Sequence, residues 1–222
     1  MNVSLFGATG MVGSGVLIEC LQDPRVDSVL AIGRSRSALS HAKLRQIVHD
    51  DFFDYTALRD ELAGRDACFF CLGVSAAGKS EADYTRLTYD LTMAAARTIA
   101  DVNPQSVFCY VSGQGTDSTG RARMMWARVK GRTENDLLAL PLKAYMFRPG
   151  FIQPLKGVRS RTRLYDAIYK VLGPLYPILR RFFPRSVTTS ENVSRAMIEV
   201  AANGFERRIL ENPDINGLAA RG

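Results

Sequence analysis

The chain has 222 residues, of which 46% are hydrophobic and 23% charged, a composition that is typical of a soluble globular protein and excludes a disordered one. A chain of this length can bury one sizeable core, so we expect a single domain over residues 1–222. The net charge of +7 would suit a nucleic-acid-binding protein, but no recognised binding module accompanies it, so we expect no nucleic-acid partner.

The first residues, MNVSLFGATG, contain no basic stretch ahead of a long apolar run, so no signal peptide is expected. A membrane-spanning helix needs about 18 consecutive apolar residues, and the sequence offers no such run. These features predict a cytoplasmic protein. Its oligomeric state is left open between a monomer and a homodimer.

Short apolar runs with the composition of buried strands alternate with helix-like segments. The strand-like runs are NVSLF, SVLAIG, RQIVHD, ACFFCLG, SVFCYVS and KAYMFRP, and helical spacing occurs near residues 11–22, 83–101 and 123–139. Strand followed by helix, repeated, predicts a parallel sheet with helices on both faces. We therefore expect an α/β fold, a Rossmann-like doubly wound parallel sheet with a small C-terminal helical cap.

The first predicted turn, in LFGATGMVGSGV, has glycines at the spacing of a dinucleotide-binding loop. They permit a tight turn, let the backbone approach a pyrophosphate and let the following helix pack closely on the sheet. The helix then offers free N–H groups and the positive end of its dipole to a phosphate. The residues expected to contact the cofactor here are Gly7, Thr9, Gly10, Met11, Val12 and Gly13.

The second predicted strand ends in AIGRSRS. NAD-binding proteins usually place an acidic residue here for the ribose 2′-hydroxyl, whereas this chain has Arg34 and Arg36. Guanidinium groups suit a 2′-phosphate, so NADP(H) is favoured over NAD(H). The alternative is that both arginines are solvated surface residues.

Cys68 and Cys71 form a C-x-x-C pattern inside the strand-like run ACFFCLGV. Such a pattern can indicate redox or zinc chemistry, but alternation along a strand sends these two side chains to opposite faces. We interpret them as buried thiols and expect no metal site.

Basic residues gather between Lys156 and Arg185, where eight lysines and arginines accompany one acid, Asp166. We expect residues 156–187 to form a helical cap over the substrate side of the cleft. An anionic or acyl substrate pocket and peripheral contact of residues 156–185 with an anionic membrane are the alternatives. Farther on, Thr188 and Glu191 fit a capping box that opens a helix through about residue 202, and ERRILENPDI has the pattern of a closing strand.

Five motifs in order, GATGMVG, FFCLGVSAAGK, YVSGQG, VKGRTENDL and FRPGFI, give the chain a resemblance to the short-chain dehydrogenase/reductase superfamily. It is most similar to the Tat-interacting, NADPH-binding oxidoreductase group of the extended or atypical branch. The similarity covers roughly residues 2–155.

This resemblance implies roles for particular residues. It places Asp51 and Phe52 beside the adenine, the backbone of Cys71, Leu72 and Gly73 along the adenosine ribose, and Pro149, Gly150 and Phe151 facing the nicotinamide. Ser112 matches the catalytic serine, and Lys130 matches the lysine of the Tyr-x-x-x-Lys motif, which holds the nicotinamide ribose.

The tyrosine position of that motif is occupied by Trp126, the only tryptophan in the chain. Reduction of a carbonyl needs a proton for the developing alkoxide, and an indole N–H does not ionise usefully near neutral pH. Tyr110 and Tyr84 are possible substitute acids, although each is also a good packing residue.

Three functions remain open on these grounds. The first is an NADP(H)-dependent oxidoreductase that acts on a carbonyl, alcohol or sugar-like compound, with its proton supplied by Ser112, a nearby tyrosine or water. The second is a catalytically silent NADP(H)-binding sensor that acts through a protein partner. The third is an epimerase or dehydratase with tightly held cofactor.

Overall fold

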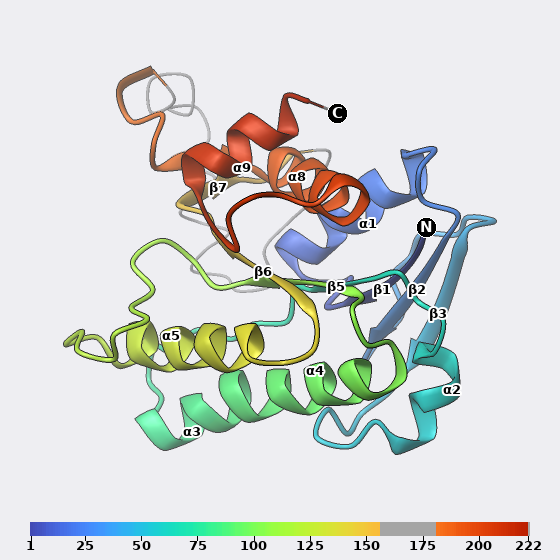
Figure 1. Ribbon diagram of the computed structural model, residues 1–222, viewed down its shortest axis with the longest axis horizontal. Helices are drawn as coiled ribbons and strands as arrows, with labels where there is room; N and C mark the ends of the chain where they lie inside the picture. Colours follow the sequence, from blue (N-terminus) through green and yellow to red (C-terminus); the bar gives the residue numbers. More distant parts are fainter. Residues whose placement is uncertain (156–180, 222) are drawn as a thin grey trace.

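The computed structural model describes residues 1–155 and 181–221, and a parallel β-sheet runs through its centre (Figure 1). Within these ranges, seven strands form this sheet in the order β3-β2-β1-β4-β5-β6-β9, and every neighbouring pair is parallel. The strands are β1 (Asn2–Phe6), β2 (Ser28–Gly33), β3 (Leu44–Val48), β4 (Ala67–Phe70), β5 (Val107–Val111), β6 (Lys143–Arg148) and β9 (Ile209–Glu211).

The strand order reverses beside β1, because the chain adds β2 and β3 on one side and then returns to add β4 on the other. Phe6 of β1 pairs with Ile32 on one side and with Phe70 on the other. The central strands are buried on both faces, which is why their sequences are continuously apolar. Sheets of this kind bind ligands in the crevice at the carboxyl ends of the strands flanking the reversal.

Two groups of helices cover the two faces of the sheet (Figure 1). One face carries α1 (Met11–Gln22), α8 (Ser190–Asn203) and α9 (Asn212–Ala219), and the other carries α2 (Arg59–Leu62), α3 (Glu81–Thr85), α4 (Leu91–Val102) and α5 (Met125–Leu138). Each face has its own buried apolar cluster. The predicted doubly wound α/β fold is therefore confirmed.

The helix expected over residues 83–101 is irregular. A π-helical segment, η2 (Arg86–Asp90), joins α3 to α4, and a 3₁₀ turn, η1 (Thr56–Leu58), leads into α2. Nothing in the spacing of the apolar residues distinguishes this π-helical segment from ordinary helix.

A small parallel sheet was not predicted. β7 (Phe151–Gln153) pairs with β8 (Val187–Thr189), with Ile152 opposite Thr188. The two strands lie on either side of residues 156–180, so most of the cap expected over residues 156–187 lies outside the described residues. The cap and the single-domain assignment stay predictions.

Two local expectations near the carboxyl terminus hold only in part: α8 and the closing strand β9 both form, but the cap of α8 and the end of β9 differ from the prediction. The capping residue of α8 is Thr189, whose hydroxyl accepts the Asn192 N–H at 3.0 Å, whereas Thr188 belongs to β8. The expected closing strand stops at Glu211, because Pro213 lies in the first turn of α9, where proline needs no hydrogen bond.

The four cysteines are free thiols, and the predicted opposite orientation of Cys68 and Cys71 is confirmed. Cys68 belongs to the cluster beneath α4 and α5, while Cys71 packs against the cluster beneath α1 and α8. Burial raises the pKa of the Cys71 thiol to about 12, which disfavours the thiolate that redox chemistry needs. None of the helices in the described ranges is long and apolar enough to span a membrane.

Candidate functional site

The turn between β1 and α1 leaves no room for side chains at two of its glycines. Gly7 has a left-handed φ of 82°, and a Cβ there would lie 2.9 Å from the carbonyl carbon of Cys71. A Cβ at Gly13 would lie 2.1 Å from the carbonyl oxygen of Gly7. The Gly10 N–H closes the turn by donating to that same oxygen at 2.9 Å. These contacts fix the backbone at the point where α1 begins.

The amino terminus of α1 therefore lies at the strand-order reversal, with Thr9, Met11 and Val12 half-buried around it. The first N–H groups of a helix have no acceptor within the helix, and the first turn of α1 contains no acidic side chain. This end of the helix can accept an anion.

The end of β2 places two cations next to the glycine turn. Thr9 of the glycine turn and Ser35 line the same small cavity. Arg34 and Arg36 flank Ser35 in the chain, so both lie next to the turn. Both arginines are exposed, and neither has an ion-pair partner within the described part of the chain.

The residues expected around the adenosine follow β3 and β4. Asp51 is exposed and accepts the Phe53 N–H at 2.9 Å, whereas Phe52 is buried against Tyr55. The Cys71 N–H donates to the carbonyl oxygen of Phe6 at 3.0 Å. The backbone of residues 71–73 thus passes directly alongside the glycine turn.

Beyond this backbone a cavity of about 670 Å³ opens beside the start of α5, and we call it the α5 cavity. Its lining comprises residues 74–77, Tyr84, residues 123–126 and Lys130. The indole of Trp126 packs over Gly115, where a Cβ would lie 3.3 Å from the ring. Trp126 and Lys130, four residues apart on α5, line the same cavity.

The Lys130 ammonium donates a hydrogen bond to the carbonyl oxygen of Ser112, the residue that follows β5. This contact holds the ammonium at the carboxyl edge of the sheet. Burial lowers the pKa of Lys130 to about 8, and the carboxylate of Glu134 on the same helix opposes that shift, as expected for a desolvated amine near an opposite charge.

The Ser112 hydroxyl belongs to a buried polar network and does not bond to the Lys130 ammonium, which contacts the backbone oxygen of Ser112. It donates to Oε1 of Glu134 at 2.5 Å, and the Arg148 guanidinium binds both oxygens of that carboxylate. Glu134 is fully buried, and the Ser118 hydroxyl donates to it at 3.2 Å. Glu134 and Arg148 were missed from the sequence, although an acid one turn after Lys130 on the core-facing side of a helix was an available signal.

The segment expected to face the nicotinamide is held by close backbone packing. A Cβ at Gly150 would lie 2.1 Å from the carbonyl oxygen of Ser186, and the Gly150 N–H donates to Asn212 at 3.0 Å. The Pro149 carbonyl oxygen accepts the Gln114 N–H, and Phe151 begins β7. These residues connect the end of β6 to the small sheet.

The two candidate substitute tyrosines have different positions. Tyr110 is fully buried in the cluster beneath α4 and α5, and burial raises its pKa far above the ordinary value. Tyr84 is also buried but lines the α5 cavity. Of these two tyrosines, only Tyr84 borders the space next to Lys130.

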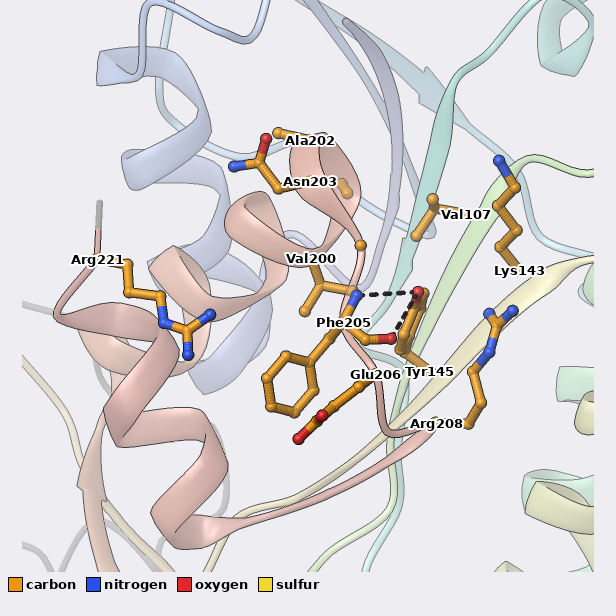
Figure 2. A pocket seen from close by; sticks show the side chains of 12 residues that line it. Val107, Lys143, Tyr145, Val200, Ala202, Asn203, Phe205, Glu206, Arg208 and Arg221 are labelled. Atoms are coloured by element: carbon orange, nitrogen blue, oxygen red, sulfur yellow. Dashed lines mark hydrogen bonds between the residues drawn. The ribbon is translucent and has the colours of Figure 1, made fainter.

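A second cavity, of about 800 Å³, lies at the opposite edge of the sheet (Figure 2). We call it the β6 cavity; it is lined by Val107, Lys143, Tyr145, residues 200–206, Arg208 and Arg221. Figure 2 shows the Tyr145 hydroxyl bonded to the backbone of Phe205, whose N–H and carbonyl oxygen lie at 3.2 and 3.4 Å. Val107 and Lys143 begin β5 and β6, so this cavity lies at the amino ends of the strands.

Comparison with known sequences places the chain in a family. The chain matches no protein-family model. It is 30% identical over 191 residues to "Protein fmp52, mitochondrial" of Emericella nidulans, covering 81% of this chain and 79% of the relative. The corresponding Aspergillus fumigatus protein is 30% identical over 180 residues, with 78% and 74% coverage. The chain belongs to the Fmp52 family. Because the Fmp52 relatives are named as mitochondrial proteins, the cytoplasmic location expected from the sequence was wrong.

Solved structures similar to this Fmp52-family chain share its fold at low sequence identity. A short-chain dehydrogenase family protein from Francisella tularensis has a TM-score of 0.65 and 16% identity, covering 91% of each chain. A UDP-N-acetylglucosamine 4-epimerase from Methanobrevibacter ruminantium has a TM-score of 0.70 and 17% identity, covering 94% of this chain and 74% of the epimerase. The expected resemblance to short-chain dehydrogenases/reductases is thereby confirmed for the fold.

Proposed function

We propose that this Fmp52-family protein is a mitochondrial oxidoreductase that binds NADP(H) in preference to NAD(H) and acts on a carbonyl or alcohol compound in the α5 cavity. The main support is the glycine turn, whose backbone packs against Cys71 and presents the start of α1 at the strand-order reversal. The proposed reaction depends on this turn, because the turn would hold the cofactor.

The residues present fit a dinucleotide. Gly7 and Gly13 let the backbone turn tightly where α1 begins, and the α1 amino terminus offers N–H donors to a pyrophosphate. Arg34 and Arg36 lie next to this turn, exposed and without ion-pair partners in the described chain. Their guanidinium groups suit a 2′-phosphate.

A nicotinamide cofactor, when bound, supplies a hydride for a carbonyl carbon, and the chain must supply the proton for the carbonyl oxygen. Trp126 has no ionisable proton, and the Ser112 hydroxyl is committed to Glu134. The Lys130 ammonium lines the cavity and has a pKa of about 8, so it can release a proton near neutral pH. We assign the proton transfer to Lys130 and a positioning role to Ser112, whose carbonyl oxygen accepts from the ammonium.

Calorimetric titration with NADPH and NADH tests this proposal. The wild-type protein should bind NADPH about tenfold more tightly, because a charge-assisted hydrogen bond contributes about 1.5 kcal/mol or more. Arg34→Ala should weaken NADPH binding and leave NADH binding unchanged, and Arg207→Ala, far along the chain beside Asp214, is the matched control. Absence of binding by either nucleotide would refute the proposal.

A catalytically silent, NADP(H)-binding sensor is the second candidate, and the indole of Trp126 at the acid's position favours it. Turnover separates the two functions. If the wild type binds NADPH but reduces no carbonyl compound, while Trp126→Tyr gains that activity, the sensor function is supported. If wild-type turnover depends on Lys130, the oxidoreductase function holds.

A further inference from the structure

We propose that the α5 cavity binds an apolar, medium-chain oxo acid, with its carboxylate at Arg123 and its carbonyl group at Lys130. This inference rests on the proposed function and specifies its substrate class. It is drawn from the lining of the cavity alone.

The walls of the cavity are apolar. Val74 and Ala76 lie on one segment of the lining, and Met124, Met125 and Trp126 lie on the other. Val74 is 40% and Met124 59% exposed, so two large apolar side chains remain in contact with water around an open space. Covering them with a ligand removes this surface from water, at about 0.8 kcal/mol for each buried methylene group, and methionine adapts well to varied apolar shapes.

The charges of the lining are positive only. Arg123 and Lys130 are both among the lining residues, and the described lining contains no aspartate or glutamate. The Arg123 guanidinium has no ion-pair or hydrogen-bond partner in the described ranges, where only the backbone oxygen of this residue accepts a hydrogen bond, from Arg128. A free guanidinium beside an apolar wall complements a carboxylate attached to an apolar chain.

The positions of the two cations along the chain indicate the scale of the ligand. Arg123 precedes the first residue of α5, Met125, and Lys130 lies five residues further on. At 1.5 Å per residue, Lys130 is about 8 Å along the helix axis from its start. A ligand that reaches both cations therefore needs a medium-length chain between its two polar ends.

The fluorescence of Trp126 can report ligand binding in the α5 cavity, because this residue is the only tryptophan in the chain and lines the cavity. Decanoate, decanol and acetate are titrated below their micelle-forming concentrations while the fluorescence of Trp126 is recorded. Decanoate should give a saturable change with an affinity about tenfold higher than that of decanol, and acetate should give none.

Arg123→Ala tests the carboxylate contact. In this variant the affinity for decanoate should fall to that for decanol, whereas Arg121→Ala, two residues earlier and outside the lining, should behave as wild type. Equal affinities of the wild type for decanoate and decanol, or no saturable change with decanoate, would overturn the proposal.

The same protein samples are titrated with NADPH by calorimetry, so that the two proposals fail separately. NADPH binding without decanoate binding overturns the substrate class alone. Loss of NADPH binding overturns the proposed function, whatever decanoate does. A decanoate derivative with an aldehyde at its far end should then be reduced by NADPH, with one hydride and one proton added to give the primary alcohol.

Discussion

The α5 and β6 cavities each contain a lysine, but they lie at opposite edges of the sheet. Lys130 is held at the carboxyl edge by the carbonyl oxygen of Ser112, in a lining with Trp126 and two methionines. Lys143 is exposed at the amino edge, in the larger β6 cavity. There the Arg208 guanidinium lies over the Tyr145 ring at 4.7 Å, and the Tyr145 hydroxyl is satisfied by the Phe205 backbone.

This difference teaches that cavity size is a poor guide to the site in this fold. The carboxyl edge brings together the glycine turn, the α1 amino terminus and a desolvated amine, because parallel strands all end there. The cations at the amino edge, Lys143, Arg208 and Arg221, are exposed to solvent. The predictions below test whether chemistry is confined to the first of these edges.

Exchanging each lysine for methionine gives the largest expected contrast. Lys130→Met should lower the rate of aldehyde reduction by about 10²–10⁴-fold, the usual contribution of a general acid, and Lys143→Met should leave it unchanged. Steady-state rates with NADPH and the aldehyde derivative of decanoate provide the measurement. Equal losses in both variants would contradict the assignment of the site.

Removing one carboxylate near each cavity tests how rigidly the two edges are built. Glu134→Ala leaves the Arg148 guanidinium partly buried without its main partner and should cost about 3–5 kcal/mol of stability. Glu206→Ala breaks an exposed contact of 3.9 Å with Arg207 and should cost less than about 1 kcal/mol. Urea unfolding followed by circular dichroism compares them, and similar costs would argue against a structural role for the Glu134 network.

Adding a methyl group to the glycine turn tests whether the backbone conformation of this turn is needed for NADPH binding. Gly13→Ala places a Cβ against the Gly7 carbonyl oxygen and should cost about 1–3 kcal/mol, with weaker NADPH binding. Gly217→Ala, in α9, meets no atom within 4 Å and serves as the control. An unchanged NADPH affinity in Gly13→Ala would show that the turn does not contact the cofactor.

A pH profile gives the smallest and most specific effect. The pKa of Lys130 is lowered to about 8, so its acidic, protonated form predominates below that pH and is lost as the pH rises through it. The reduction rate should be level at lower pH and should fall about tenfold per unit above pH 8. Lys130→Arg should be slower but level across this range, since a guanidinium stays protonated; a falling profile in that variant would assign the titration to another group.

Much of the fold could be predicted because its determinants are local. Buried parallel strands are read as short apolar runs, and the bounds of α1 agree with the predicted segment 11–22. The cap of α8 is Thr189, one residue after the predicted Thr188. The helix α9 was not predicted, although Pro213 in ENPDI is a usual sign that a helix begins. The cytoplasmic location was wrong because composition and apolar runs do not determine the compartment, whereas the Fmp52 relatives are named as mitochondrial.

The interior of the site could not be predicted, because it depends on residues that only the tertiary structure brings together. The orientation of the Ser112 hydroxyl depends on Glu134 of α5, which is in turn held by Arg148 of β6. The Tyr-x-x-x-Lys comparison could identify Lys130 and Trp126 as neighbours, but it carried no information on which way the serine side chain points.

The β7–β8 ladder has a consequence for how this protein can change over evolution. Three residue pairs, from Phe151 with Val187 to Gln153 with Thr189, fasten both ends of the intervening stretch of chain at neighbouring points. Lengthening a tethered stretch costs little additional closure entropy, so insertions and deletions between these anchors need not disturb the parallel sheet. The number of residues between β7 and β8 can therefore vary without changing the pairing of these two strands.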